Sequence, residues 1–380
     1  MGLLLVTVLA IPKLPSTFAG QAETPITADQ LRDVYSQSPE HWPAMVVDKF
    51  VDAAELGLLP PMPYPADNPP SKAKEQLGRQ LFYDPRLSAS NQMACVSCHD
   101  PDLGWADGRT VSFGTRRLEL PRNAPTIKNS GYFDQLFWDG RAESLEDLSL
   151  KVIENADEMH GMAEQVAAKL DAVPEYHTLF AEVFEREGPI QVVEITQAIA
   201  TFVRAQNGGR SAFDRFLKGR KDALSDSELR GLHLFRTKAL CMNCHHGPTL
   251  SDGRLHSTGL SLYGTRNEDL GQFHVTGKPE DSGKFKTPSL RDISRTRPYM
   301  HHGLFESLEV TVRAYNGGMP TPRARKDRPD DLLLPTKSPL LRELNLTEQE
   351  QADLVAFMES LEEPHRRIVP PKLPPFADQR

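Results

Sequence analysis

The amino-acid sequence predicts a mainly α-helical protein built from two similar domains. Its 380 residues exceed what one compact core usually holds. Helical patterns outnumber alternating strand patterns along the chain. A Gly-x-x-Leu-Phe segment occurs at 78–82 and again at 231–235, and each copy precedes a Cys-x-x-Cys-His motif. A repeat of this long period indicates duplicated domains and not a solenoid.

The composition limits the classes of function that fit. Hydrophobic residues make up 39% and charged residues 25% of the chain, which suits a soluble globular protein and rules out a multi-span membrane protein. The chain has 44 Lys and Arg against 52 Asp and Glu, a net charge of −8. This balance argues against a nucleic-acid binder, whereas it permits a redox partner with a basic face.

The N-terminal segment predicts export. An apolar run over 2–11 is followed at 16–20 by small residues suited to cleavage, so residues 1–20 are predicted to be a signal peptide. Ten apolar residues cannot span a bilayer, and we expect no membrane span. Of the 31 prolines, 11 lie in the first 70 residues, which predicts a Pro-rich arm or linker over 21–70.

Periodicity and caps then predict the helices of the repeated unit. A helix-like stretch leads into each Gly-x-x-Leu-Phe segment, and the second stretch opens on a capping box at 225–228. Another capping box, at 347–350, opens the last helix. The further predicted helices cover 143–155, 160–172, 190–205 and 346–361.

These patterns give the predicted domain organisation. The first domain covers 71–220 and the second covers 221–364, with the boundary near 220 inside a charged segment. Residues 365–380 are predicted to be a Pro-rich tail.

The cysteines carry the strongest chemical signal. The chain holds four, in the segments Cys95-Val-Ser-Cys98-His99 and Cys241-Met-Asn-Cys244-His245. This is the attachment pattern of c-type haem, in which two thiols bond one porphyrin and the adjacent imidazole becomes an iron ligand. A zinc site of four cysteines and a pair of dithiol redox motifs are the alternatives, but neither needs a histidine after each pair. The sequence therefore predicts two cytochrome c-like domains, each with one covalently bound c-type haem.

Further motifs, in this order and at this spacing, identify a family resemblance that runs from roughly 70 to 362. The chain resembles the bacterial di-haem cytochrome c peroxidase superfamily, which includes MauG-like proteins. The motifs that carry the resemblance are Leu81-Phe-Tyr-Asp-Pro-Arg-Leu-Ser88, Arg122-Asn-Ala-Pro-Thr126, Phe137-Trp-Asp-Gly-Arg-Ala142, Asp157-Glu-Met159, Phe285-Lys-Thr-Pro-Ser-Leu-Arg291 and Pro298-Tyr-Met-His-His-Gly303.

The resemblance implies that the haem on His99 reacts with peroxide. Relatives that need reductive activation carry a distal histidine where this chain has Thr115, and no histidine occurs between 100 and 159. We therefore expect an open, five-coordinate haem at rest. Glu158 matches the distal acid–base glutamate of the family, although without the resemblance it would read as a surface glutamate.

Other positions near this first haem are also implied. Leu148 and Val152 stand where relatives have glutamine and proline in the distal pocket. Trp138 matches a tryptophan that lies between the haems and can relay electrons, and it can be a core residue at the same time. Arg141 is either a propionate partner or a member of an ordinary salt bridge.

The haem on His245 is implied to be six-coordinate. The family position of its second ligand falls on Tyr315, and MauG is similar in having tyrosine there. A phenolate oxygen would give this haem a low potential. The alternatives are that Tyr315 is a packed core residue, or that Met319, Met300 or His301 reaches the iron. The histidines His246, His256 and His274 are expected to be loop residues or to support the ligands.

The resemblance also implies a calcium ion between the domains. It would be held by the Asn123 side chain, the carbonyls of Thr296 and Pro298, and waters.

Three functions compete on these observations. The first is a periplasmic di-haem peroxidase of a Gram-negative-type bacterium, an oxidoreductase of the cytochrome-c peroxidase type. It would reduce hydrogen peroxide with electrons relayed from the second haem, supplied by a small cytochrome c or a cupredoxin. The second is a MauG-like oxidase that uses peroxide-derived high-valent iron to modify a partner protein. The third is a di-haem electron carrier without catalysis. A homodimer is compatible with each of them.

Overall fold

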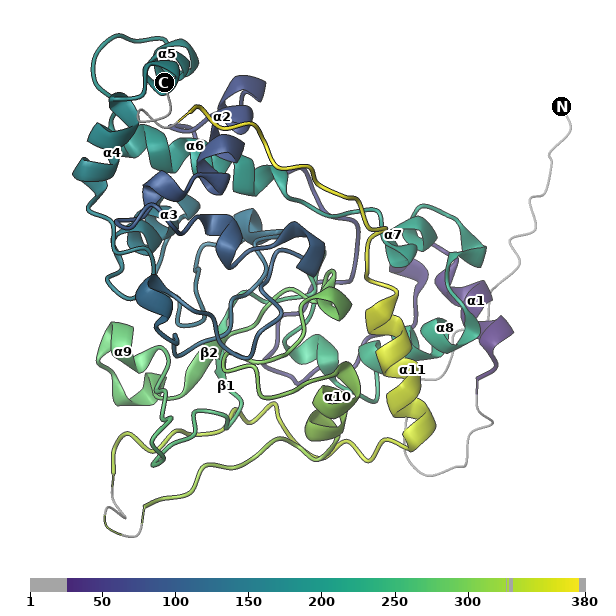
Figure 1. The fold of residues 1–380 in the computed structure, drawn as a ribbon. Helices are drawn as coiled ribbons and strands as arrows, with labels where there is room; N and C mark the ends of the chain where they lie inside the picture. The colour runs from purple at the N-terminus through teal and green to yellow at the C-terminus, as the bar shows by residue number, and fades with distance from the viewer. Residues whose placement is uncertain (1–25, 326, 328–330, 376–380) are drawn as a thin grey trace, which may run out of the picture.

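The computed structural model describes residues 26–325, 327 and 331–375, so the predicted signal peptide lies outside the described residues. The fold is mainly helical, as predicted (Figure 1). The helices are α1 Ala28–Tyr35, α2 Lys72–Tyr83, α3 Leu145–Glu154, α4 Ala163–Asp171, α5 Pro174–Phe184, α6 Val192–Ala205, α7 Ala212–Leu217, α8 Asp226–Arg236, α9 Phe273–Thr276, α10 Leu308–Asn316 and α11 Glu348–Glu359. The strands β1 Leu255–Ser257 and β2 Lys284–Lys286 form one antiparallel pair.

The four helices predicted from periodicity correspond to α3, α4, α6 and α11. The predicted capping boxes at Ser225 and Thr347 are confirmed, since each side chain accepts a hydrogen bond from the backbone three residues on. Helices α5 and α10 were not predicted. Helix α5 begins at Pro174 almost directly after α4, and α10 contains a β-branched run that disfavours a helix until tertiary packing supports it.

The repeated glycine has a direct structural reason. In the first half α2 crosses α6, and a Cβ added to Gly78 would lie 1.8 Å from the carbonyl oxygen of Ala198. In the second half α8 crosses α11, and a Cβ added to Gly231 would lie 1.9 Å from the carbonyl oxygen of Asp353. Each half therefore brings two helices into backbone contact at its glycine, where another residue would separate them.

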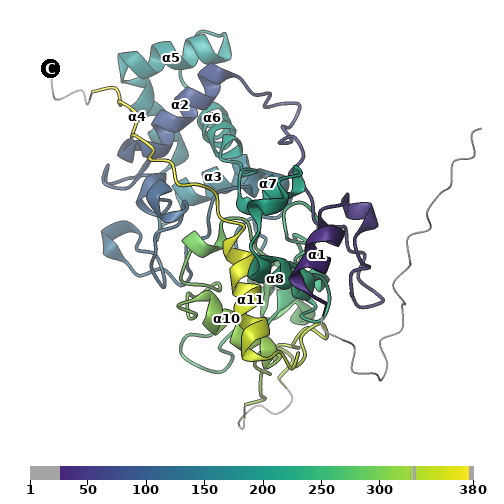
Figure 2. The same ribbon diagram turned by 90° about the vertical axis from the view of Figure 1, so that its right-hand side faces the viewer.

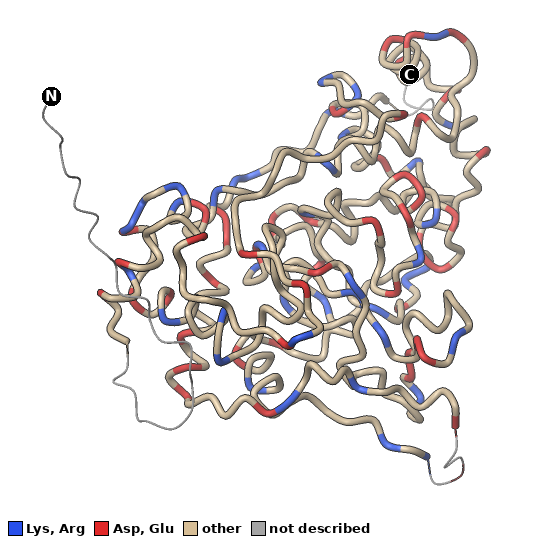
Figure 3. The backbone as a smooth tube through the Cα atoms, turned by 180° about the vertical axis from the view of Figure 1, so that it is seen from behind, with Lys and Arg blue, Asp and Glu red and all other residues tan. Residues whose placement is uncertain are grey.

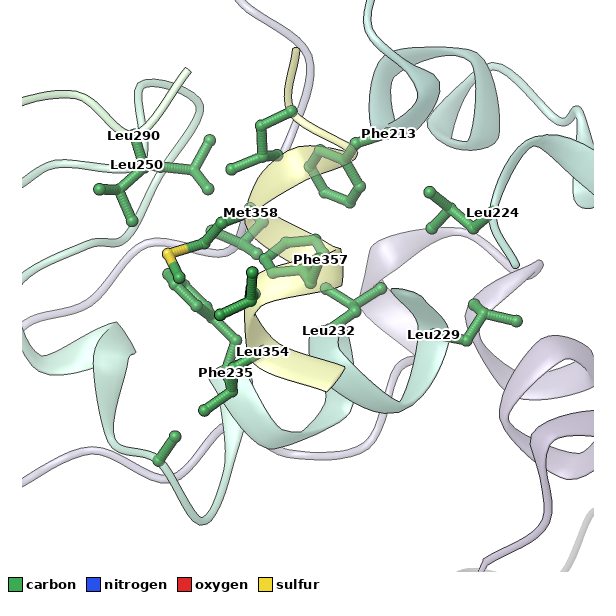
Figure 4. Close-up of a cluster of buried hydrophobic side chains, with 14 of the residues drawn as sticks. Phe213, Leu224, Leu229, Leu232, Phe235, Leu250, Leu290, Leu354, Phe357 and Met358 are labelled. Atoms are coloured by element: carbon green, nitrogen blue, oxygen red, sulfur yellow. The ribbon is translucent and has the colours of Figure 1, made fainter. Parts of the chain in front are cut away.

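Two clusters of buried apolar side chains follow this division. One draws on helices α2 to α6, and the other on α1, α7, α8, α10 and α11 (Figures 1 and 2). In the second cluster the ring of Phe357 meets Phe213 and Phe235 edge-on at 5.4 and 5.2 Å (Figure 4). Along the chain after α6, the buried residues pass from the first cluster to the second between Val203 and Phe213. This change comes earlier than the predicted boundary near 220, because the aromatic side chains of α7 pack on α11.

Part of the predicted arm over 21–70 is a packed helix. Thr27 caps α1, which buries Leu31 and Tyr35 in the second cluster, and Trp42 meets Tyr35 edge-on at 5.1 Å. The sequence interpretation missed this helix because the prolines around it dominated the composition. Helix α1 therefore packs on the second half, beside α8 (Figure 2).

The Pro-rich tail leaves α11, which belongs to the second half, and runs over the first half (Figure 1). Arg79 of α2 donates to the carbonyl of Val369, and Gln80 donates to the carbonyl of Lys372 at 3.2 Å. Arg86 donates to the carbonyl of Pro374 at 2.9 Å. Backbone carbonyls of the tail are thus paired with side chains of the first half.

Among the described helices none has both the length and the apolar character required to cross a membrane. Acidic and basic residues are interspersed along the described chain (Figure 3).

Candidate active site

Both Cys-x-x-Cys-His motifs border one cavity of about 1220 Å³ between the two halves. It exceeds the ~300–1,000 Å³ of an ordinary ligand pocket. The motif residues that line it are Cys95, Cys98, His99, Cys241, Cys244 and His245. Glu158, Trp138, Arg141 and Tyr315, which come from other segments, line the same cavity.

The two motif histidines are oriented in the same way. The Nδ1 atom of His99 lies 3.1 Å from the carbonyl oxygen of Trp105, and that of His245 lies 3.0 Å from the carbonyl oxygen of Leu250. A proton on Nδ1 satisfies each carbonyl and leaves Nε2 with a lone pair for iron. Trp105 and Leu250 both have left-handed backbone, with φ of 64° and 50°, which is unusual for bulky side chains. Each half therefore orients its histidine through the carbonyl of a left-handed residue, although the two loops differ in length.

None of the four cysteines forms a disulfide bond. Burial raises the pKa of Cys95 and of Cys241 to about 12, and that of Cys98 to about 11. Zinc binds thiolates, whereas thioether formation to a porphyrin leaves no charge on sulfur. The raised pKa values of these three thiols fit covalent haem better than a zinc site.

Cys244, Asp252 and His256 lie close enough together to suggest another metal site. The Nε2 atom of His256 lies 2.7 Å from an oxygen of Asp252. Burial by itself would lower the pKa of His256, but Asp252 and the Cys244 thiol together raise it to about 10. The pairing of His256 with Asp252 accounts for the proximity of these side chains without a metal.

Glu158 faces the cavity beside the first motif. Asn155 donates to its carboxylate at 2.9 Å, and a guanidinium nitrogen of Arg141 lies 3.9 Å away. Burial raises the pKa of Glu158 above its ordinary value, although Arg141 and Asn155 act in the opposite direction. A raised pKa suits a carboxyl group for accepting a proton and then returning it.

The segment around Thr115 is fixed against Glu158. The backbone N–H of Thr115 donates to the carbonyls of Asp157 and Glu158 at 3.0 and 2.9 Å. Gly114 lines the cavity, and Thr115 is not among its lining residues. Leu148 also lines the cavity, together with Val152, so helix α3 gives this wall an apolar surface.

Trp138 connects the two halves. Its indole donates to the carbonyl of Asn123 at 2.9 Å, and its own carbonyl accepts from the backbone of Lys286 at 2.8 Å. The His301 ring lies edge-on at 6.4 Å. Arg141, three residues on, is engaged in a salt bridge to Asp139 at 3.0 Å.

Tyr315 lies on α10 and lines the cavity near the second motif. Burial raises the pKa of its phenol, and Cys244 and Cys241 raise it further. Met319 is buried but does not line the cavity, whereas Met300 and His301 do. The His301 ring is stacked on Phe285 at 3.5 Å between centroids. Of the two candidates on or just after α10, only Tyr315 borders the cavity.

The residues of the predicted calcium site lie in one region. Asn123, Thr296 and Pro298 all border the cavity. The Asn123 amide nitrogen donates to the carbonyl of Arg109 at 2.6 Å, which leaves its side-chain oxygen available to a cation.

Of the other predicted histidines, His274 borders the cavity and His246 does not. His246 accepts from the backbone of Ala54 at 3.4 Å, and His274 accepts from the backbone of Leu270 at 3.3 Å.

Two features of the cavity wall were not singled out from the sequence. Arg122 joins the halves, with salt bridges to Asp139 at 2.5 Å and Asp269 at 2.7 Å. Lys286 lines the cavity from the end of β2. Both belong to motifs that carry the family resemblance, but nothing in the sequence distinguishes them from their neighbours.

Comparisons with known proteins agree with this arrangement. A sequence model of the family described as Di-haem cytochrome c peroxidase matches residues 72–222. The cytochrome-c peroxidase IdrP1 of Pseudomonas sp. (strain SCT) is 39% identical over 337 residues, 80% of this chain and 85% of that protein. The methylamine utilization protein MauG of Methylorubrum extorquens is 37% identical over 316 residues, 82% of this chain and 85% of that protein.

Solved structures extend the likeness to the fold. A MauG-like protein associated with microbial copper homeostasis superposes with a TM-score of 0.72 at 36% identity, over 80% of this chain and 93% of that one. The diheme peroxidase BthA from Burkholderia thailandensis superposes with a TM-score of 0.65 at 23% identity, covering 84% of this chain and 94% of its own. The latter likeness concerns the fold alone.

The chain therefore belongs to the di-haem cytochrome c peroxidase family, whose members carry haem c. It is an oxidoreductase of the cytochrome-c peroxidase type, and its relatives include both named peroxidases and MauG.

Proposed function

We propose that this protein is a periplasmic enzyme that reduces hydrogen peroxide to water at the cavity wall formed by His99 and Glu158. The observation that carries the proposal is the position of Glu158. It is a carboxyl group with a raised pKa that faces the cavity beside the first motif, in a chain that has no histidine over 100–159 to block the iron. Haem c, attached at both motifs, supplies the iron that binds peroxide and exchanges electrons with it.

The protein's own residues supply proton transfer and exclusion of water. Glu158 accepts a proton from one peroxide oxygen and returns it to the other, which leaves as water. Asn155 and Arg141 hold the carboxylate in position. Leu148 and Val152 keep this wall apolar. Two electrons and two protons balance the conversion of one peroxide to two waters.

The electron path of this proposal uses the second half. His245 would hold the second haem, which would accept single electrons from a small cytochrome c or a cupredoxin, and Trp138 would lie on the path from there to the first half. Trp138 suits this step because it bonds to Asn123 on one side and Lys286 on the other. The proposal includes a calcium ion at Asn123, Thr296 and Pro298.

A second candidate function is MauG-like oxidation of residues on a partner protein. The observation in its favour is Tyr315, which borders the cavity while Met319 does not. An anionic oxygen ligand favours oxidised iron, so the second haem would share oxidising equivalents instead of delivering electrons. The relatives MauG and the MauG-like protein associated with copper homeostasis are compatible with this candidate.

One experiment tests both candidates. Optical and EPR spectra of the oxidised protein are recorded, and stoichiometric peroxide is then added with and without reduced cytochrome c. A high-spin haem at rest and rapid oxidation of cytochrome c are the results expected for the peroxidase. Slow cytochrome oxidation with a persistent spectral change would favour the second candidate. Two low-spin six-coordinate haems at rest would exclude an open iron and contradict both.

The Tyr315 assignment has its own test. Tyr315→Phe should change the low-spin spectrum, and Tyr315→Met should raise the potential of the second haem. If the Tyr315→Phe spectrum matched that of the unaltered protein, the tyrosine would not be a ligand.

A further inference from the structure

Lys286 is a cation that faces the cavity without a carboxylate partner. It ends β2, it is partly buried, and it lines the cavity between the halves. Within the described part of the chain, no carboxylate oxygen lies within salt-bridge distance of its ammonium group. Lys284, two residues earlier on the same strand, is by contrast paired with Asp281 at 2.9 Å and does not line the cavity.

The surroundings of Lys286 fix its position. Its backbone N–H donates to the carbonyl of Trp138 at 2.8 Å, which holds this end of β2 at the junction of the halves. Its ammonium nitrogen lies 3.6 Å from the centroid of the Phe133 ring. A cation–π contact of this kind offsets only part of the cost of taking the charge out of water.

The carboxylate that acts on Lys286 already has another partner. Asp252 favours the charged form of Lys286, but its carboxylate is bonded to His256 at 2.7 Å. Burial outweighs Asp252 and lowers the pKa of Lys286 to about 8, so the ammonium group is still largely protonated at neutral pH. A positive charge at the wall of this cavity therefore needs an anionic group from whatever fills the cavity.

Haem has two propionate carboxylates, and they are the anions that attachment at the two motifs would bring into this space. We propose that Lys286 binds a haem propionate at the junction of the two halves and thereby raises the reduction potential of that haem. The pair would form a charge-assisted hydrogen bond. This inference rests on haem attachment, which is part of the proposed function, but not on the identity of the electron donor or of the substrate.

The test compares Lys286→Met with Lys284→Met in the mature di-haem protein. Haem content is measured first, so that a loss of haem is not mistaken for a change in potential. Each haem potential is then measured by spectroelectrochemistry, and the propionate bending bands are recorded by resonance Raman spectroscopy. Removal of a cation beside a propionate favours ferric iron, so one haem of Lys286→Met should become about tenfold harder to reduce, a fall of about 59 mV. Its propionate band should also shift, while Lys284→Met should leave both unchanged.

Two results would overturn the inference. One is an Lys286→Met protein with both potentials equal to those of Lys284→Met. The other is a changed potential without any change in the propionate bands, because a distant charge would act in that way. If Lys286→Met did not incorporate haem, Lys286→Arg would decide. Near-normal potentials with a shifted propionate band would support direct contact, and an unshifted band would contradict it.

Discussion

The two halves of the molecule share a scaffold and differ in the residues that face the cavity from other segments. Both cross two helices at a glycine, and both aim the motif histidine with a carbonyl from a left-handed residue. Opposite these common parts, the first half presents Glu158 on an apolar wall and the second half presents Tyr315. The two halves thus position their motif histidines with similar scaffolds, and they differ in the few side chains that face the cavity.

The shared parts are those whose geometry leaves little choice. A residue larger than glycine at either crossing would meet a carbonyl oxygen at under 2 Å, and a motif histidine turned the other way would lose its acceptor. The cavity-facing positions carry no such restriction, because many side chains fit an open wall. The two halves can therefore keep a common scaffold while the side chains that face the cavity differ.

The largest effect is expected from removing one attachment motif. Cys241→Ala with Cys244→Ala should lower the haem content from two to one per chain in a pyridine haemochrome assay, because the thioether bonds of the second haem cannot form. The corresponding change at Cys95 and Cys98 should also leave one haem but should abolish the spectral response to peroxide. An equal peroxide response in both proteins would remove the proposed difference between the halves.

Replacement of the proposed acid–base group comes next. Glu158→Gln should slow the reaction with peroxide by about 10²- to 10⁴-fold in stopped-flow measurements, since the amide cannot transfer the proton. The resting spectrum should be unchanged. Glu154→Gln is the matched control, because this glutamate of α3 is exposed and lies outside the cavity lining. A similar small effect in both variants would contradict the assignment of Glu158.

The common scaffold can be tested at its two crossings. Gly78→Ala and Gly231→Ala should each lower the free energy of unfolding by about 1–3 kcal/mol, because the added methyl group forces the helices apart. Denaturant titration followed by circular dichroism measures the loss. A Cβ at Gly57 would meet only Pro248 at 3.9 Å, so Gly57→Ala should be close to neutral. A stable Gly231→Ala protein would mean that the second crossing tolerates separation.

The smallest expected effect is a shift, toward higher pH, of the acidic side of the pH–rate profile for peroxide. Burial raises the pKa of Glu158, and only its carboxylate form can accept a proton from peroxide. The peroxide rate should therefore be highest above this raised pKa and fall about tenfold per pH unit below it, starting at a higher pH than an ordinary glutamate would give. In Glu158→Gln this fall in rate should vanish. A fall that persists in this variant would belong to another group.

Particular elements show how far sequence reasoning reaches. The helices α3, α4, α6 and α11 were predictable because each has an apolar period on one face, and the caps of α8 and α11 were predictable because capping is local. Helix α1 and the position of α7 were not. Their partners lie far along the chain, on α8 and α11, and no local pattern specifies such a contact.

Some residues of the candidate site could likewise be identified from the sequence, and others could not. The motif cysteines and histidines were identifiable because covalent haem attachment requires a fixed local spacing. The sequence by itself therefore determined the two Cys-x-x-Cys-His motifs, the helical class, the repeated glycine segment and the absence of histidine over 100–159. Only the tertiary structure decided that Glu158, Trp138, Tyr315 and Lys286 border one cavity, and that Met319 does not. The physical reason is range: a covalent motif or a helix period is fixed by neighbouring residues, whereas a cavity wall is assembled from segments whose distance in the sequence has no bearing on their distance in space.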